Sequence, residues 1–331
     1  MKPSIVMQFL QSIISNPKMP AVFLWGAPGV GKSSVCRQVA KKAGIGFIDI
    51  RLALMDPTDL RGIPVPEKGQ ARWLPPSMLP TEGKGILLLD EFNLAPPLIQ
   101  SSAFQLVLDG RIGEYVLPEG WHVVSAGNAA HHGAHVYNMS APLKNRFIHV
   151  DFELDLDDWR TWAVQHGVDA RVLEFISFRP ELLFKFDPKQ KANAFPTPRT
   201  WEFVSSALGC LDDAEVPEDI TDEILEGAIG VGTATEFRAY LSMKKELPSL
   251  QKILDGKDLI PERIDVTAAL VTGLAMSAKP EQFNRLLEYS ENLPPETAVL
   301  MGKLLIARDK AIVIKCPKWV EWSSKYHDFI V

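Results

Sequence analysis

The feature that most constrains this 331-residue chain is a glycine-rich segment near its N-terminus. Residues 26–33 read Gly-Ala-Pro-Gly-Val-Gly-Lys-Ser and fit the pattern G-x-x-x-x-G-K-[ST] at every fixed position. An apolar run, residues 21–25, precedes this segment, and residues 32–43 have the pattern of a helix. Backbone N–H groups of such a loop surround phosphate oxygens, aided by the helix dipole. The segment therefore predicts a phosphate-binding loop in an α/β domain.

Two side chains of this loop are expected to contact the ligand directly. Lys32 is predicted to reach the β and γ phosphates of a nucleotide, and the Ser33 hydroxyl to bind Mg²⁺. The predicted nucleotide-binding residues of the loop are Gly26, Ala27, Pro28, Gly29, Val30, Gly31, Lys32, Ser33 and Ser34. No N-K-x-D sequence, which reads guanine, occurs in the chain, so ATP is the expected nucleotide.

A second apolar run, residues 86–89, ends in two carboxylates, Asp90 and Glu91. Alone, this pattern is usually just the exit of a buried strand. Following Lys32 in the chain, it predicts that Asp90 holds the Mg²⁺ shell and that Glu91 polarises the attacking water. The second acid favours hydrolysis over simple nucleotide sensing.

Three further polar residues are candidates for contacts with the nucleotide. Asn128 follows a predicted strand and could orient the water or contact the γ phosphate, although a loop asparagine is the commoner reading of such a residue alone. Arg146 precedes another strand and could neutralise charge as the γ-phosphoryl leaves; the alternative is a solvated cation. Arg199 stands at a helix start, where a cation is unfavourable unless an anion is near, which favours contact with phosphate.

The order of the predicted elements indicates a doubly wound parallel sheet, which binds ligands at the carboxyl ends of its strands. The expected strands are residues 21–25, 47–52, 85–90, 121–126 and 147–152, with helices over 4–15, 32–43 and 98–108. Two segments interrupt the alternation. Residues 56–82, rich in Pro and Gly, are expected to be a long irregular insertion. Residues 110–121 are expected to form a β-hairpin with its turn near Pro118–Gly120.

Helical patterns replace strand patterns from about residue 153. Helices are expected over residues 156–166, 169–177, 199–210, 217–227, 233–246, 263–277, 279–290 and 295–307. We therefore expect an α/β nucleotide-binding core over residues 1–153, a connecting helical segment over 154–198, and a helical lid and C-terminal region over 199–331.

Charge and cysteine usage limit the class of protein. Residues 1–152 carry 14 Lys and Arg against 11 Asp and Glu, whereas residues 153–331 carry 21 against 30, so the second half would repel a phosphate backbone. The three cysteines, Cys36, Cys210 and Cys316, are widely spaced and suit a reducing compartment. No apolar run approaches the ~20 residues of a membrane span. We expect a cytoplasmic protein.

One histidine cluster also needs an interpretation. His131, His132 and His135 lie close together in the sequence, but no Cys or carboxylate is near. Surface histidines are therefore expected rather than a metal site.

With these residues in hand, the chain resembles the MoxR group of AAA+ ATPases, in the dynein-related branch. The resemblance covers residues 20–205. It is carried by GAPGVGKS, DLRGIP, LLLDEFNLAPP, LVLDGRIGEYVLPEGW, SAGN, LKNRF and PTPRTW. The first and third of these are general to the superfamily, whereas DLRGIP and the hairpin stretch point to this group.

The resemblance implies an αβα sandwich with a five-stranded parallel sheet in the order 5-1-4-3-2, followed by a helical lid. It implies a ring, usually a homo-hexamer, with ATP at subunit interfaces. The segments at 56–80 and 110–121 look like the helix-2 insert and the pre-sensor-1 hairpin, which would face the central pore or an axial partner.

The resemblance also implies roles for individual residues. Residues 26–33 look like Walker A, and Asp90 and Glu91 like Walker B. Asn128 looks like sensor 1, Arg146 like the arginine finger that reaches a neighbour's site, and Arg199 like sensor 2. The group often has Asp before the finger arginine, where this chain has Asn145.

The resemblance implies a remodelling chaperone that acts on a protein client. Its partner would be a separate protein with a von Willebrand A domain, because no D-x-S-x-S signature occurs here. One alternative is a nucleic-acid motor or loader, with a weak basic groove formed by Arg61, Lys68, Arg72 and Arg111. The other is a signalling switch that binds ATP without sustained turnover, against which Glu91 argues.

Overall fold

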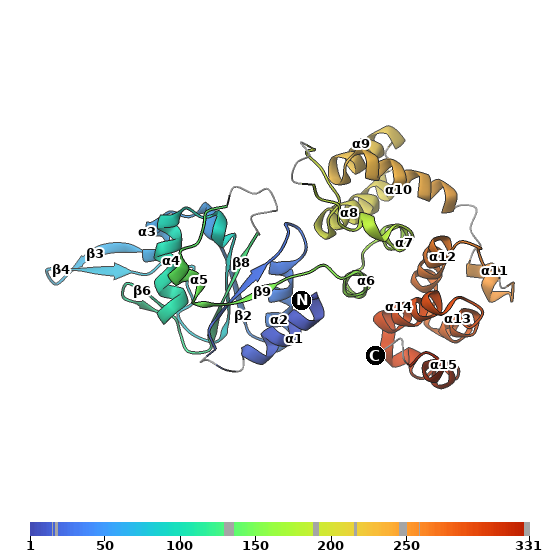
Figure 1. The fold of residues 1–331 in the computed structure, drawn as a ribbon, viewed down its shortest axis with the longest axis horizontal. Coiled ribbons are helices and arrows are strands. Elements are labelled where there is room, and N and C mark those ends of the chain that lie inside the picture. The colour runs from blue at the N-terminus through green and yellow to red at the C-terminus, as the bar shows by residue number, and fades with distance from the viewer. Residues whose placement is uncertain are drawn as a thin grey trace. The chain divides into compact units, whose positions relative to one another are not determined.

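The computed structural model describes residues 1–14, 16, 19–128, 136–187, 192–214, 217–244, 250–257 and 259–327. The chain divides into two compact units (Figure 1). The first comprises residues 1–155 with 187–190, and the second comprises residues 156–186 with 191–331.

A five-stranded parallel sheet forms the centre of the first unit. Its strands are β1 (Ala21–Trp25), β2 (Gly46–Arg51), β5 (Gly85–Asp90), β8 (Trp121–Gly127) and β9 (Phe147–Asp151). They lie in the order β2-β5-β8-β1-β9, and every neighbouring pair is parallel. Counted along the chain and read from the β9 edge, this is the order 5-1-4-3-2, so the predicted topology is confirmed.

Helices cover both faces of this sheet, which is why its central strands are apolar along their whole length. The helices of this unit are α1 (Pro3–Ile13), α2 (Lys32–Ala43), α3 (Pro57–Arg61), α4 (Pro97–Asp109) and α5 (Ala141–Lys144). Figure 1 shows α1 and α2 on one side of the sheet and α4 on the other. Phe23, Phe92 and Phe147 meet edge to face in the core that includes residues of α4.

The expectation of an irregular segment at residues 56–82 was wrong for residues 57–74, whereas residues 75–82 form no helix or strand. After α3 the segment forms the antiparallel hairpin β3 (Ile63–Glu67) and β4 (Gln70–Leu74), which projects from the unit in Figure 1. The prolines of β3 hid the strand pattern, but a two-stranded ribbon tolerates them because both strands are edges. Gly62 closes the base of the hairpin, where a Cβ would lie 1.9 Å from the Leu74 carbonyl oxygen.

The second hairpin is present, but its turn lies elsewhere. Strands β6 (Arg111–Ile112) and β7 (Tyr115–Val116) join through Gly113 and Glu114, not near Pro118–Gly120. Gly113 has φ 57°, which suits a two-residue hairpin turn. The Pro-Glu-Gly sequence instead turns the chain into β8, where the Trp121 N–H donates to the Pro118 carbonyl.

The second unit is helical in its described part. Its helices are α6 (Leu156–Gln165), α7 (Ala170–Phe178), α8 (Pro198–Ala214), α9 (Glu218–Ile229), α10 (Val231–Lys244), α11 (Leu250–Leu254), α12 (Ile264–Ser277), α13 (Phe283–Ser290), α14 (Pro295–Val313) and α15 (Trp319–Lys325). Short 3₁₀ turns in the two units occupy Leu52–Leu54, Phe92–Leu94, Pro180–Leu182 and Pro280–Gln282. The sequence predicted these helices except α11 and α15.

The tryptophan-rich end of the chain packs into this helical core. Trp322 of α15 is fully buried and donates from Nε1 to the Ser290 hydroxyl, 2.8 Å away. Gly302 of α14 leaves room for its ring, since a Cβ there would lie 2.1 Å from the ring edge. No helix among the described residues is long and apolar enough to cross a membrane.

Candidate nucleotide-binding site

The glycine-rich loop joins the end of β1 to the start of α2. Gly29 and Gly31 have φ 76° and 103°, a region that side chains disfavour. No side chain caps the N-terminus of α2, no acidic residue lies in its first turn, and a Cβ at Gly31 would meet nothing within 4 Å. The first N–H groups of a helix need external acceptors. The loop therefore fits an anion such as a phosphate group.

Lys32 lies folded across this loop and is largely buried. Its ammonium donates to the carbonyl oxygens of Gly26 and Ala27, 2.8 and 2.9 Å away, and to Oδ1 of Asn128, 3.1 Å away. These bonds hold the ammonium at the loop. The structure thus brings Lys32 and Asn128 together, and their contacts with a nucleotide stay a prediction.

Ser33 and Asp90 meet at the adjacent ends of α2 and β5. The Ser33 hydroxyl donates to Oδ2 of Asp90 over 2.5 Å, and the Glu91 backbone N–H donates to Oδ1 over 2.8 Å. Mg²⁺ prefers oxygen ligands and is commonly held by one or two carboxylates together with phosphate oxygens. The Ser33–Asp90 pair therefore fits the predicted magnesium site.

Glu91 has an unusual backbone conformation for a residue with a side chain. It has φ 55° and ψ 34°, in the left-handed region, between the end of β5 and a 3₁₀ turn. Such conformations cost free energy and cluster at functional sites. Its side chain is partly exposed beside Asp90, which a water-polarising carboxylate requires.

Two other acidic or nucleophilic groups lie behind this site. Burial, and then the charge of Asp90, raises the pKa of Asp49, while Arg51 and Arg37 oppose that shift. Burial strongly raises the pKa of Cys36, and the charges of Asp90 and Asp49 add to the effect. Cys36 is therefore a neutral core thiol rather than a reactive one.

Sequence reasoning missed Asn93, which holds Asn128 in place. Asn93 donates from Nδ2 to the Asn128 carbonyl over 2.7 Å and accepts from the Asn128 N–H over 3.2 Å. Its side chain is buried, and Gly127 permits the approach because a Cβ there would lie 2.4 Å from Oδ1 of Asn93. A polar residue within the apolar segment Phe-Asn-Leu-Ala was the available signal.

The structure does not join Arg146 to this cluster within the described chain. Arg146 is exposed in the turn between α5 and β9, and its backbone N–H donates to the Leu143 carbonyl. A hydrogen-bonded link connects this turn to the loop strand. Trp25 Nε1 donates to Nδ1 of His149, so Nε2 of His149 carries the proton and donates to the Lys144 carbonyl, each over 2.9 Å.

Arg199 lies in the second unit, as the second residue of α8, and it is exposed. The Thr197 hydroxyl accepts from the Thr200 N–H and caps this helix. Whether Arg199 contacts a phosphate stays a prediction. His131, His132 and His135 lie outside the described residues, and no group of three or more His, Cys, Asp or Glu side chains suited to a metal ion occurs among the residues described.

Residues 21–147 match the sequence model of the AAA domain, dynein-related subfamily. The chain contains an AAA domain of this subfamily. AAA domains are in general ATPases that bind ATP or ADP with Mg²⁺, and the matched range spans every site residue from Gly26 to Arg146.

Several solved structures are similar to this chain. A variant of RuvB from Thermotoga maritima is 16% identical over 76% of this chain and 73% of that chain, with a TM-score of 0.41. NtrX from Brucella abortus in complex with ADP is 14% identical over 98% and 67%, also with a TM-score of 0.41. A candidate ATPase from Cytophaga hutchinsonii is 16% identical over 97% and 87%, with a TM-score of 0.36. No curated protein matches the chain.

Proposed function

We propose that this AAA domain hydrolyses ATP at the cluster formed by Lys32, Ser33, Asp90, Glu91 and Asn128. The observation that carries the proposal is the Ser33–Asp90 hydrogen bond beside the uncapped N-terminus of α2. It puts a hydroxyl and a carboxylate, both magnesium ligands, next to a phosphate-binding loop.

Each side chain has a distinct task in this proposal. Lys32 neutralises phosphate charge, and Ser33 and Asp90 hold Mg²⁺, which when bound supplies charge neutralisation at the phosphates. Glu91 polarises the attacking water, and Asn128, held by Asn93, orients that water or the terminal phosphate.

We further propose that the active form is a homo-oligomeric ring, a hexamer as in the MoxR group, in which Arg146 completes the site of a neighbouring copy. Arg146 is exposed in the turn before the edge strand β9, at the opposite end of the β1–β9 pair from the loop that holds Lys32, and this supports the role. An arginine supplied in trans stabilises the charge that develops in phosphoryl transfer. Arg199 would sense the nucleotide from the helical unit.

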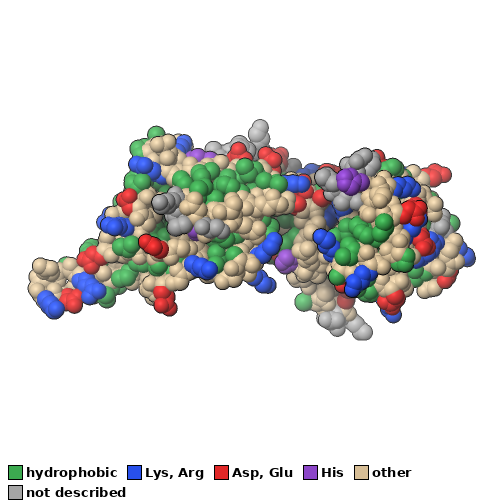
Figure 2. All heavy atoms as spheres, turned by 90° about the horizontal axis from the view of Figure 1, so that it is seen from below, with side chains coloured by type: hydrophobic (Ala, Val, Ile, Leu, Met, Phe, Trp, Pro, Cys, Tyr) green, Lys and Arg blue, Asp and Glu red, His purple; other side chains and the backbone are tan. Residues whose placement is uncertain are grey.

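The ring would remodel a protein client together with a von Willebrand A-domain partner. The β3–β4 hairpin supports contact with protein, because Ile63 and Leu74 at its base are 68% and 49% exposed. It carries both signs of charge, as Figure 2 shows for the projecting end of the molecule, and Arg72 pairs with Glu67 over 2.9 Å. The nucleic-acid motor needs a basic surface, so this pairing weakens that alternative.

Steady-state hydrolysis of ATP by three variants tests the proposal. Glu91→Gln should retain nucleotide binding and lose hydrolysis. Asp90→Asn should lose hydrolysis, and its nucleotide binding should no longer depend on the Mg²⁺ concentration. Arg146→Ala should lose hydrolysis alone and regain it when mixed with Glu91→Gln subunits, since such mixtures contain sites with an intact Glu91 beside an intact Arg146. A strictly monomeric protein that hydrolyses ATP at full rate would exclude the ring, and unchanged turnover by Glu91→Gln would exclude the assigned base.

A further inference from the structure

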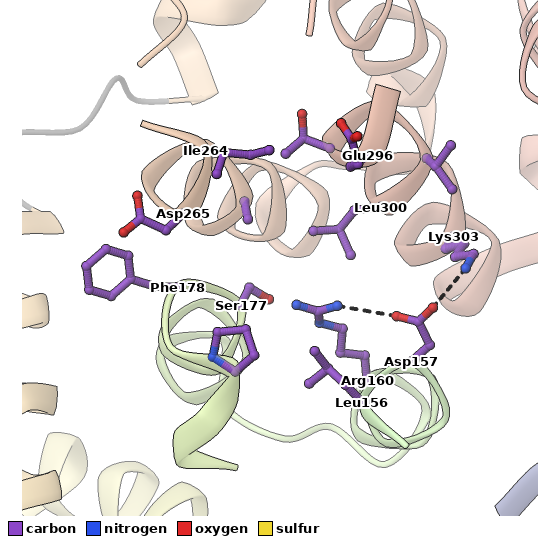
Figure 3. A pocket seen from close by; sticks show the side chains of 14 residues that line it. Leu156, Asp157, Arg160, Ser177, Phe178, Ile264, Asp265, Glu296, Leu300 and Lys303 are labelled. Carbon is purple, nitrogen blue, oxygen red and sulfur yellow. Dashed lines mark hydrogen bonds and ion pairs between the residues drawn. The ribbon is translucent and has the colours of Figure 1, made fainter. Parts of the chain in front are cut away.

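The helical unit contains a pocket that the nucleotide site does not use. It lies between α6, α7, α12 and α14 and has a volume of about 390 Å³ (Figure 3). Leu156, Phe178, Ile264, Val299 and Leu300 give it apolar walls. This volume lies within the range of small-molecule sites. The polar and charged residues that also line the pocket are Asp157, Arg160, Ser177, Asp265, Glu296, Thr297 and Lys303.

One cation reaches the middle of this pocket. Figure 3 shows the Arg160 guanidinium extending from α6 into the space between Ser177 of α7 and Leu300 of α14. Arg160 is only 9% exposed. It donates to Oδ1 of Asp157 over a long 3.3 Å, and its Nε is buried without a hydrogen-bond partner. A guanidinium has five N–H donors, so this one is poorly satisfied.

The nearby anions do not compensate the charge of Arg160. Asp157 is shared, because Lys303 donates to its Oδ2 over the shorter distance of 2.8 Å. Asp265 is bound by Arg263, and the Ser177 hydroxyl already donates to the Leu173 carbonyl. Glu296 also lines the pocket, but it is exposed. Among the described residues, no acceptor reaches the buried Nε of Arg160.

Keeping this arginine there costs folding free energy. Burial lowers the pKa of Arg160, and Asp157 opposes that effect without cancelling it. Desolvation of an ion is unfavourable, and replacing a poorly compensated buried ion by an apolar residue is often neutral or stabilising. A ligand of opposite charge would offset this cost.

We propose that this pocket binds a small apolar carboxylate. Its carboxylate pairs with Arg160, and its apolar body packs against Leu156, Ile264 and Leu300. The carboxylate of such a ligand supplies the acceptor that the buried Nε of Arg160 lacks. A phosphate dianion fits less well, because Asp157 and the exposed Glu296 also line the pocket.

Calorimetric titration of the full chain tests this proposal. The probes are 3-phenylpropanoate, octanoate and cyclohexanecarboxylate, each compared with the alcohol of the same skeleton and with inorganic phosphate. At least one carboxylate should bind, and its alcohol and phosphate should bind at least tenfold more weakly. No heat from any of the three carboxylates up to millimolar concentration overturns the proposal, as does equal binding of acid and alcohol.

Two variants separate the charge from the cavity. Arg160→Met keeps a flexible apolar stem, so carboxylate binding should fall at least tenfold while the thermal unfolding midpoint stays equal or rises. Leu300→Trp fills the pocket without changing charge and should also abolish binding, which keeps the test valid if the first variant fails to fold. The control is Arg238→Met in α10, whose acidic partners Asp222 and Glu226 do not line the pocket, and it should bind normally. Unchanged binding in Arg160→Met overturns the proposal.

Discussion

Asn93 offers the sharpest test of how the nucleotide site is built. Its side chain makes two hydrogen bonds to the backbone of Asn128, of 2.7 and 3.2 Å, and is 3% exposed. Each such bond contributes about 1 kcal/mol net, so Asn93→Ala removes about 2 kcal/mol of positional restraint on Asn128. If that restraint is needed in the transition state, kcat falls by roughly 30-fold.

A positioning role for Asn93 predicts more than a lower kcat. Asn93 acts through Asn128, so Asn93→Ala combined with Asn128→Ala should be no slower than Asn128→Ala alone. Nucleotide affinity should change little, because Lys32 retains its bonds to Gly26 and Ala27.

Steady-state ATP hydrolysis and the binding of a fluorescent ATP analogue measure both quantities. Ser101→Ala is the control, since the Ser101 hydroxyl bonds only the Pro97 carbonyl within α4 among the hydrogen bonds found, and it should leave kcat unchanged. Rate losses that multiply in the double variant would refute the positioning role, and so would a loss of nucleotide binding equal to the loss of kcat.

Two further predictions concern stability. Gly302→Ala should lower the free energy of unfolding by about 2 kcal/mol or more, because its Cβ would overlap the buried Trp322 ring. Gly227→Ala, where a Cβ would meet open space in an exposed part of a helix, should raise the free energy of unfolding by up to about 1 kcal/mol. Urea unfolding compares the two variants, and equal effects would contradict this packing. Burial alone would raise the pKa of Asp169, but hydrogen bonds from Arg171 outweigh it and hold that pKa below its ordinary value. The charge of Asp169 therefore stabilises the fold above about pH 4, and this contribution is lost as pH falls through the lowered pKa. Asp169→Asn keeps an oxygen to cap α7 and should cost about 1 kcal/mol at pH 7; a cost that does not shrink in acid would refute the ion pair.

The local sequence was sufficient to predict secondary structure where a single segment carries the whole pattern. The apolar run at residues 21–25, followed by the glycine-rich segment at residues 26–33, predicts a buried strand and the turn and helix after it. Residues 63–74 were not predictable in this way, because two prolines interrupt the alternation and the pairing depends on Gly62 meeting Leu74 across the ribbon.

Side-chain roles that arise from tertiary packing also could not be predicted from the sequence. Asn93 can hold Asn128 only because Gly127, which has no side chain, lets the Asn93 side chain approach the backbone of β8. Arg160 reads as one more surface cation in an amphipathic helix, and only the meeting of four helices buries it. In both cases the informative partner lies far away along the chain.

His149, which bridges Trp25 and Lys144, would link the nucleotide loop to the arginine turn in a ring of the proposed kind. Trp25 immediately precedes the nucleotide loop, and the carbonyl at Lys144 lies two residues before Arg146. A shift of the loop on nucleotide exchange would therefore pull on the segment that presents this arginine to the next subunit. In this way the nucleotide state of one copy would affect ATP hydrolysis in its neighbour through two hydrogen bonds. His149→Leu removes both bonds and would uncouple hydrolysis in neighbouring copies.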